Sequence, residues 1–102
     1  MTALHFAAYC GDLDELKLQL ALGADPNAKD QYRGYSALHW LTDMAATGGE
    51  RLEMLRLLVS SGADVNLMSE NGETPLSLAR AAGSGNEEMV KELLRLGAIE
   101  RA

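Results

Sequence analysis

Few side chains in this sequence could carry out acid–base or nucleophilic chemistry. The 102 residues include two histidines, His5 and His39, and a single cysteine, Cys10. A cysteine nucleophile needs a base and an orienting group beside it, and a zinc site needs about four Cys, His or acidic ligands. The three residues do not have ligand spacing, and both histidines follow the same short motif. We therefore predict no catalytic residue, no metal and no cofactor, and an enzyme would have to rely on His5 or Cys10.

Two other patterns resemble functional sites but have simpler interpretations. The acidic residues Asp12, Asp14 and Glu15 fall where a helix is expected to begin, and carboxylates in a first helical turn complement the helix dipole. The stretch Gly83–Gly85 lacks the glycine and lysine that complete a phosphate-binding loop. We interpret both patterns as structural.

Composition and charge exclude several classes of partner. The chain has 15 acidic and 9 basic residues, a net charge of −6 and an isoelectric point near 4.7. Nucleic acids and anionic membrane surfaces attract basic proteins, so we expect neither as a partner. We see no apolar run long enough to span a bilayer, and a lone cysteine suits a reducing compartment. We expect a cytoplasmic protein, or a nuclear one in a eukaryote, with one domain over residues 1–102.

Two short motifs recur along the chain. The first opens each unit, as Thr2-Ala3-Leu4-His5, Ser36-Ala37-Leu38-His39 and Thr74-Pro75-Leu76-Ser77. The second closes it, as Gly23-Ala24-Asp25-Pro26-Asn27, Gly62-Ala63-Asp64-Val65-Asn66 and Gly97-Ala98. Copies of the first motif begin 34 and 38 residues apart, and copies of the second 39 and 35 residues apart. Repeats of this length indicate a stacked array of small structural units.

The opening motif and its period resemble those of the ankyrin repeat family, whose units carry Thr-Pro-Leu-His-x-Ala every 33 residues. The resemblance implies an all-α solenoid of three helix-loop-helix units joined by β-hairpin loops. The repeats would span about residues 1–33, 34–71 and 72–102, the last one cap-like. In this family the motif histidine makes local hydrogen bonds that hold the hairpin to the helix, which we expect of His5 and His39.

Local signals place two helices in each unit. Leu13, Leu16 and Leu20 follow the i, i+3, i+7 spacing of a helical stripe. Gly11 is expected to end the first inner helix, and glycines 23, 62 and 97 to end the outer helices. Turns are expected at Arg33-Gly34 and Asn71-Gly72.

The second unit is longer than the first, with extra residues between Asp43 and Glu50. Thr47 and Ser84 each open a capping box with a glutamate three residues later, so we predict that the second and third outer helices begin there. A further residue is inserted in the first hairpin, within Gln31–Arg33. Insertions in repeat arrays map to loops on one face, which is often the binding face.

Polar substitutions suggest that both ends of the array are capped. Glu15 and Gln19 stand where the second unit has apolar residues, Met54 and Leu58. At the other end Glu87 and Glu92 stand where the second unit has leucines 52 and 57. We expect these glutamates to face solvent and the three units to be the whole array.

Phe6, Trp40 and Leu78 occupy one equivalent position of the three units. A large apolar residue at the same position of every repeat is typical of a core. We expect Trp40 to pack between units, with its indole N–H bonded to a partner.

The surface that varies between units is the best candidate for function. In ankyrin proteins it comprises the hairpin tips and the exposed ends of the inner helices, and Tyr and Arg are common anchors at interfaces. We therefore predict a non-catalytic module, itself a monomer, that binds another protein with a basic surface, using Tyr9, Tyr32, Tyr35 and Arg33 as anchors. The alternative is a structural or regulatory part of a larger multidomain protein. The full predicted set is Tyr9, Cys10, Gln31, Tyr32, Arg33, Tyr35, Asp43, Met44, Glu70, Asn71, Glu73 and Ala81.

Asn66 is a possible modification site. With Leu58 before it, Asp64-Val65-Asn66 resembles the ankyrin asparagine that some eukaryotic dioxygenases hydroxylate. We favour the simpler interpretation, an asparagine bonded to its own backbone in a hairpin.

Overall fold

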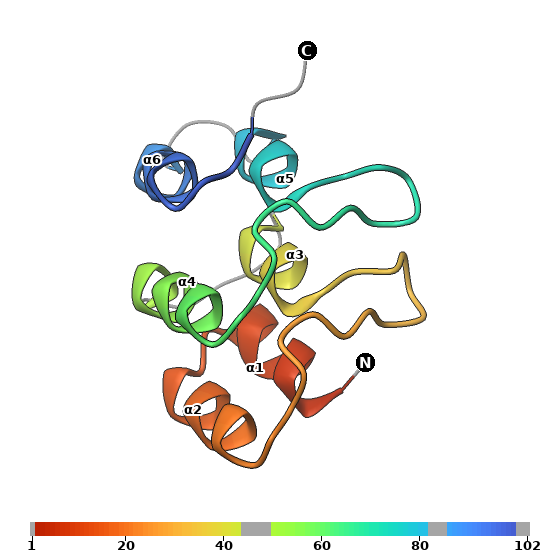
Figure 1. The fold of residues 1–102 in the computed structure, drawn as a ribbon, viewed down its shortest axis with the longest axis vertical. Coiled ribbons are helices and arrows are strands. Elements are labelled where there is room, and N and C mark those ends of the chain that lie inside the picture. The colour runs from red at the N-terminus through yellow and green to blue at the C-terminus, as the bar shows by residue number, and fades with distance from the viewer. Residues whose placement is uncertain (1, 44–49, 82–85, 100–102) are drawn as a thin grey trace.

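The computed structural model describes residues 2–43, 50–81 and 86–99 (Figure 1). Over these ranges the chain forms six α-helices and no strand. The helices are α1 (Ala3–Cys10), α2 (Leu13–Ala21), α3 (Ala37–Thr42), α4 (Arg51–Ser60), α5 (Pro75–Ala81) and α6 (Glu87–Arg95). They stack as three antiparallel pairs, with α1, α3 and α5 in an inner column and α2, α4 and α6 in an outer one (Figure 1). The predicted all-α solenoid is confirmed.

The opening motifs form the N-termini of the inner helices as expected. The hydroxyl of Thr2 lies 2.8 Å from Nδ1 of His5, and the hydroxyl of Ser36 lies 2.9 Å from Nδ1 of His39. Each histidine then uses its other ring nitrogen to reach a following loop. Nε2 of His5 lies 2.8 Å from the carbonyl oxygen of Ala28, and Nε2 of His39 lies 2.8 Å from that of Glu73. These contacts confirm the structural role predicted for both histidines.

The glycine signals also mark the helix ends correctly. Gly11 has a φ of 72° at the C-cap of α1, in the left-handed region that favours glycine. The outer helices α2, α4 and α6 end just before Gly23, Gly62 and Gly97. Thr47 and Ser84 lie outside the described residues, but the predicted helix starts are wrong. The N-cap residues are Glu50 and Asn86, so α4 begins at Arg51 and α6 at Glu87, and neither glutamate of the predicted capping boxes stands at the third position of its helix.

Two long loops project from the inner column as open hairpins (Figure 1). Hairpin 1 spans residues 30–35 and is closed by the N–H of Asp30, which donates to the carbonyl oxygen of Tyr35 at 2.8 Å. Hairpin 2 spans residues 69–73 and is closed by the N–H of Ser69, which donates to Glu73 at 2.8 Å. The N–H of Glu70 donates to the carbonyl oxygen of Arg33 at 2.9 Å, so the two hairpins are joined to each other.

Asparagine side chains join the bases of these loops. The amide of Asn66 donates to the carbonyl oxygen of Gly97 at 3.2 Å and accepts from the N–H of Ile99 at 2.9 Å. Asn27 bonds in the same way to Gly62 and Asp64. The expectation that the Asn66 side chain bonds to its own backbone is therefore wrong, because both of its amide atoms are used between successive units.

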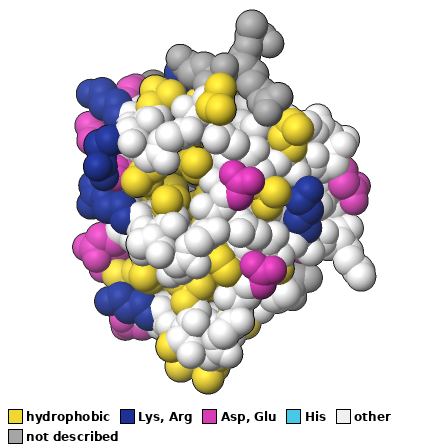
Figure 2. Space-filling model, viewed as in Figure 1, with side chains coloured by type: hydrophobic (Ala, Val, Ile, Leu, Met, Phe, Trp, Pro, Cys, Tyr) yellow, Lys and Arg dark blue, Asp and Glu magenta, His cyan; other side chains and the backbone are white. Residues whose placement is uncertain are grey.

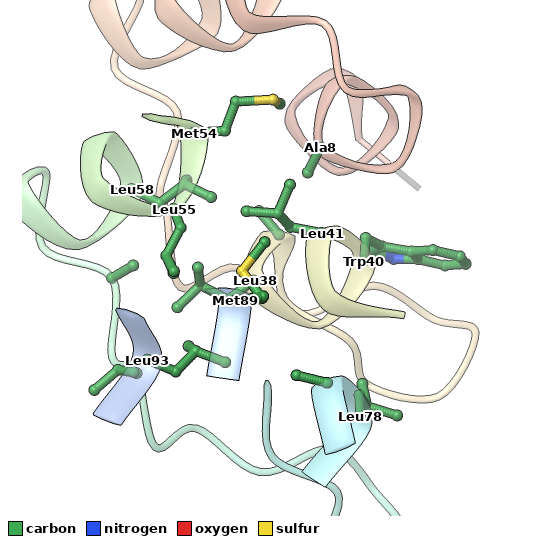
Figure 3. Close-up of a cluster of buried hydrophobic side chains, with 14 of the residues drawn as sticks. Ala8, Leu38, Trp40, Leu41, Met54, Leu55, Leu58, Leu78, Met89 and Leu93 are labelled. Atoms are coloured by element: carbon green, nitrogen blue, oxygen red, sulfur yellow. The ribbon is translucent and has the colours of Figure 1, made fainter. Parts of the chain in front are cut away.

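The core lies between the two columns and between successive pairs (Figure 3). Leu41 of α3 points toward Ala8 of α1, and both are fully buried. Trp40 and Leu78 are buried as predicted, but Phe6 is 58% exposed, which contradicts the prediction for that position. The reason is that Trp40 packs against Tyr9 of the preceding pair, at 5.3 Å between ring centroids, whereas no aromatic ring of the described residues stacks on Phe6.

The C-terminal pair corrects a second expectation. Glu92 is only 8% exposed and does not face solvent as a polar cap. Two cations cover its carboxylate: Nε of Arg56 in α4 lies 3.0 Å from Oε2, and Arg95 bonds to both oxygens from the next turn of α6. The hydrogen bonds from Arg56 and Arg95 lower the pKa of Glu92 to about 2. This glutamate therefore joins the second and third units.

Candidate functional site

The clearest hollow at the predicted binding face is a groove between the hairpins and the inner helices. It has a volume of about 340 Å³ and we call it the hairpin groove. Its lining comes from hairpin 1, hairpin 2, α5 and the end of α3. The lining residues are Tyr32, Arg33, Tyr35, Asp43, Glu73, Leu78 and Ala81. All except Leu78 belong to the set predicted from the sequence, so the fold brings half of that set to one place.

An aromatic cluster supports one wall of the groove. Tyr32 stacks on Trp40 with ring centroids 5.5 Å apart and an angle of 30° between the planes. Tyr9 and Tyr35 meet the same indole edge-on, each at 5.3 Å. Tyr32 nevertheless remains 60% exposed. The arrangement leaves Tyr32 largely exposed on an indole that three tyrosine rings contact.

Asp30 holds this wall in position, and the sequence analysis did not identify it. Its carboxylate accepts hydrogen bonds from the indole N–H of Trp40 and from the backbone N–H groups of Tyr32 at 3.0 Å and Tyr35 at 3.1 Å. Burial raises the pKa of Asp30, but the hydrogen bonds from Trp40 and from both tyrosines outweigh it and keep the pKa below its ordinary value. An aspartate that begins a turn and bonds to the backbone two residues on is an Asx turn, which is the signal that could have found it.

Tyr35 does not serve as an exposed anchor. Its side chain is fully buried and stacks on His39, with ring centroids 5.2 Å apart. Its hydroxyl lies 3.5 Å from Oε1 of Glu73, and burial raises the pKa of the phenol. The prediction of Tyr35 as an anchor is corrected on this ground: the ring forms the floor of the groove, and a partner could reach only what lies above it.

The groove contains charges of both signs. The guanidinium carbon of Arg33 lies 4.9 Å from the centroid of the Tyr32 ring, in cation–π geometry. A hydrogen bond with the Tyr35 side chain, aided by nearby Tyr32 and Glu73, raises the pKa of Arg33. Asp43 and Glu73 bring two carboxylates to the same lining. The groove can therefore recognise charge as well as shape.

The other predicted residues lie around the groove or away from it. Tyr9 is half-buried against Trp40, and the hairpin residues Gln31, Glu70 and Asn71 are exposed without lining the groove. Cys10 is exposed with a free thiol at the end of α1. Met44 lies outside the described residues.

Other kinds of site do not emerge from the part of the chain that the structure describes. Within residues 2–43, 50–81 and 86–99, no group of three or more His, Cys, Asp or Glu side chains is placed to hold a metal ion. No helix in these ranges is long and apolar enough to cross a membrane.

The convex side of the molecule has a different character. Basic and acidic side chains alternate along the edge formed by α2, α4 and α6 (Figure 2). Six charged residues of the outer helices share one repeated pattern, in which an exposed acid stands three residues before an exposed base. The pairs are Asp14 and Lys17, Glu53 and Arg56, and Glu88 and Lys91. Opposite charges at this spacing are neighbours on a helix and are typical of a solvated face.

Comparisons with known proteins match this architecture. A family model described as ankyrin repeats in three copies matches residues 4–101. Human ankyrin repeat and SOCS box protein 6 is 37% identical over 105 residues, which cover 99% of this chain and 24% of the relative. Rat ankyrin repeat and SAM domain-containing protein 6 is 34% identical over 92 residues, covering 90% of this chain and 10% of the relative.

The chain thus spans about a quarter or less of the length of these relatives. Ankyrin repeats form a non-catalytic fold that generally mediates interactions between proteins. A relative that is an enzyme by name, the Drosophila palmitoyltransferase Hip14, matches over only 12% of its length. The family model, the repeated motifs and the stacked helix pairs agree, and the chain belongs to the ankyrin repeat family.

Proposed function

We propose that this chain binds a partner protein through the hairpin groove and takes no part in catalysis. The observation that carries the proposal is the exposed residue Tyr32, which lines a groove of about 340 Å³ and is held in place by Trp40 and Asp30. A surface that is already ordered before binding loses less conformational freedom on association than a mobile one. Exposed tyrosines next to a pocket are frequent hot spots of interfaces.

The opposite side of the molecule is less suited to this role. The outer helices carry paired charges, and such pairs on an exposed helix face are well solvated. A partner that covered them would have to remove water from many charges, while the groove combines aromatic surface with a smaller set of charged groups that a partner can pair. The net charge of −6 favours a partner with a basic surface, chiefly through the rate of encounter.

The test compares two variants that each remove one large exposed side chain. Proteins captured from a lysate by the wild-type chain are identified by quantitative mass spectrometry, and the best candidate is purified for calorimetry. Tyr32→Ala is expected to weaken its binding by at least about 2 kcal/mol, the usual threshold of a hot spot. Leu22→Ala, at the end of α2 with 71% exposure, serves as the control and should bind as the wild type does.

The comparison of the two variants shows whether the hairpin groove or another surface binds the partner. Equal binding by both variants, with unchanged circular dichroism, would move the interface away from the groove. Loss of binding by Leu22→Ala alone would place it on the outer helices.

A second candidate function is a structural role within a larger protein. The observation in its favour is that both end faces of the described part offer contact surface: Phe6 is 58% exposed on α1, and a hollow of about 310 Å³ lies between α5 and α6. A longer natural chain whose neighbouring segments protect these two faces from hydrogen exchange, while Tyr32 stays free, would support this function over partner binding.

A further inference from the structure

The hairpin groove already holds a cation that belongs to the chain itself. The guanidinium of Arg33 lies over the ring of Tyr32, and Arg33, Tyr32 and Glu73 all line the same groove. Arg33 is nevertheless an exposed residue at the tip of hairpin 1. Cation–π contacts and ion pairs at exposed positions are individually weak, so the interactions that keep this guanidinium in the groove are easily exchanged.

The groove also holds a carboxylate that is placed to receive a cation. Glu73 of hairpin 2 lines the groove together with Arg33. Oε1 of Glu73 accepts a hydrogen bond from the hydroxyl of Ser69 at 3.3 Å and lies 3.5 Å from the hydroxyl of Tyr35, which fixes the carboxylate beside the floor of the groove. The aromatic ring of Tyr32, the Glu73 carboxylate and the net charge of −6 complement a guanidinium.

We infer that the hairpin groove recognises an arginine side chain of the partner and that Arg33 is its internal occupant, displaced when the partner binds. The inference rests on the proposed function and deepens it. It gives Arg33 a role opposite to that of the partner anchor predicted from the sequence, because Arg33 competes with the ligand instead of contacting it. The incoming guanidinium takes the place of Arg33 over Tyr32, beside the carboxylate of Glu73.

The test uses a small probe that does not depend on knowing the partner. N-acetyl-arginine amide is titrated into the whole ¹⁵N-labelled chain at constant ionic strength, and backbone NMR shifts are followed. N-acetyl-citrulline amide, a neutral molecule of nearly the same shape, is titrated in parallel. We expect saturable shifts confined to the residues around Tyr32, Asp43 and Glu73 with the arginine probe, and none with the citrulline probe.

Variants that each remove one charge test whether Arg33 competes with the probe. Arg33→Gln is expected to raise the affinity for the arginine probe by about two- to fivefold, the range of an exposed cation–π contact that no longer competes. Lys17→Gln removes the same charge from the convex face and should change the affinity much less. Glu73→Gln, which keeps the oxygen that faces Ser69 and Tyr35, should lower the affinity, whereas Glu53→Gln on α4 should not.

Several results would overturn the inference. An arginine probe that produces no local shifts, or shifts matched by citrulline, excludes a guanidinium site. A lower affinity of Arg33→Gln for the arginine probe shows that Arg33 helps to hold the ligand. If Lys17→Gln raises the affinity as much as Arg33→Gln does, the change reflects only the net charge of the chain. If the probe fails while a captured partner still depends on Tyr32, the arginine site is wrong and the proposed function stands; if Tyr32→Ala also binds the partner normally, both fail.

Discussion

His39 is a residue type that could act as an acid or a base, but both of its ring nitrogens are used in structural hydrogen bonds. Nδ1 of His39 faces the backbone N–H of Ser36 at 3.0 Å, which can only donate, and Nε2 faces the carbonyl oxygen of Glu73, which can only accept. The ring must therefore be neutral, with its proton on Nε2. A second proton on Nδ1 would point at another donor.

The first prediction concerns the pH dependence that this geometry creates. Burial lowers the pKa of His39 below its ordinary value of 6.5, so the unfolded chain takes up the proton at a higher pH than the folded chain. Stability should be unaffected by this group above about pH 6.5 and should fall below it, by at most about 1.4 kcal/mol per pH unit. Urea unfolding between pH 7.5 and 5.5 measures the slope. A His39 ring that titrates near 6.5 in the folded protein by NMR would contradict the argument.

The second prediction concerns Asp30, which bonds to three donors of the aromatic wall. Asp30→Ala leaves the indole N–H of Trp40 and the N–H groups of Tyr32 and Tyr35 without this acceptor. Each buried donor left unpaired costs about 1–3 kcal/mol, so we expect a loss within or above that range, together with faster hydrogen exchange at both tyrosine amides.

Trp40→Phe provides the comparison, because it removes the indole N–H and part of the ring but leaves the Asp30 carboxylate in place for the two tyrosine N–H groups. It should leave the two tyrosine amides more protected from exchange than Asp30→Ala does, whatever packing energy the smaller ring loses. Equal exchange rates in the two variants would show that Asp30 does not organise hairpin 1.

Residue types alone could predict what the repeated positions do, but not which neighbours they meet. The histidine, glycine and tryptophan predictions depend on contacts close along the chain or repeated in every unit, and the structure bears them out. Tyr35 and Phe6 were placed wrongly because their burial depends on long-range packing: Tyr35 is covered by hairpin 2 and the rings beside it, while no helix pair among the described residues covers Phe6.

At the scale of elements, the hairpins act as one layer because hairpin 2 is bonded to hairpin 1. The N–H of Glu70 donates to the carbonyl oxygen of Arg33, next to Gly34. Gly34 has a φ of 69°, and a Cβ added there would lie 3.0 Å from Cγ and 3.2 Å from the backbone nitrogen of Glu70. Gly72, at the tip of hairpin 2, has a φ of 77° and open space around it.

These two glycines give the third prediction. Alanine at either position lowers the free energy of unfolding by about 1–2 kcal/mol because of strain in the left-handed region. Only Gly34→Ala also places a Cβ in close contact with hairpin 2. Overpacking adds typically about 1–3 kcal/mol, so Gly34→Ala should be the more destabilising variant by at least about 1 kcal/mol in urea unfolding. It should also alter the groove, which Gly72→Ala should leave intact. Equal losses of stability would mean that the contact between the hairpins is loose.

The sequence could predict these elements but not how they come together. Turn residues and repeat motifs located both hairpins, and half of the predicted binding residues line one groove. The groove itself arises from the approach of hairpin 1, hairpin 2 and α5, which no local pattern encodes. This limit applies only in part to Asp30: its Asx turn is a local signal, but its bond to the indole N–H of Trp40 depends on how the loop meets the next helix.

For the whole molecule, stability comes from contacts between neighbouring units, as in other repeat arrays. Each inner helix packs on the next inner helix and each outer helix on the next outer one. The first two units meet through buried apolar side chains such as Met54, which is fully buried, and Leu41. The second and third units add a polar contact at Glu92, which the expectation of a solvent-facing cap did not foresee.

The fourth prediction tests whether Glu92 holds the third unit to the second. Its pKa of about 2 lies below the ordinary 4.5 because Arg56 and Arg95 donate to the carboxylate. The folded chain therefore takes up this proton at a lower pH than the unfolded chain, and the stabilisation is complete above about pH 4.5 and disappears as the pH falls toward 2. Glu92→Gln should lower stability at pH 6, and the gap from the wild type should narrow at pH 3.

Glu88→Gln on the same helix is the matched control, since Glu88 is exposed and no pair of arginines among the described residues binds its carboxylate. Because Arg56 and Arg95 are themselves 51% and 64% exposed, salt should also shrink the difference between wild type and Glu92→Gln at pH 6. Urea unfolding at both pH values, with and without 1 M sodium chloride, measures each effect. A gap that is the same at pH 3 as at pH 6 would mean that the carboxylate's charge does not join the units, and that Glu92 acts only through its packing.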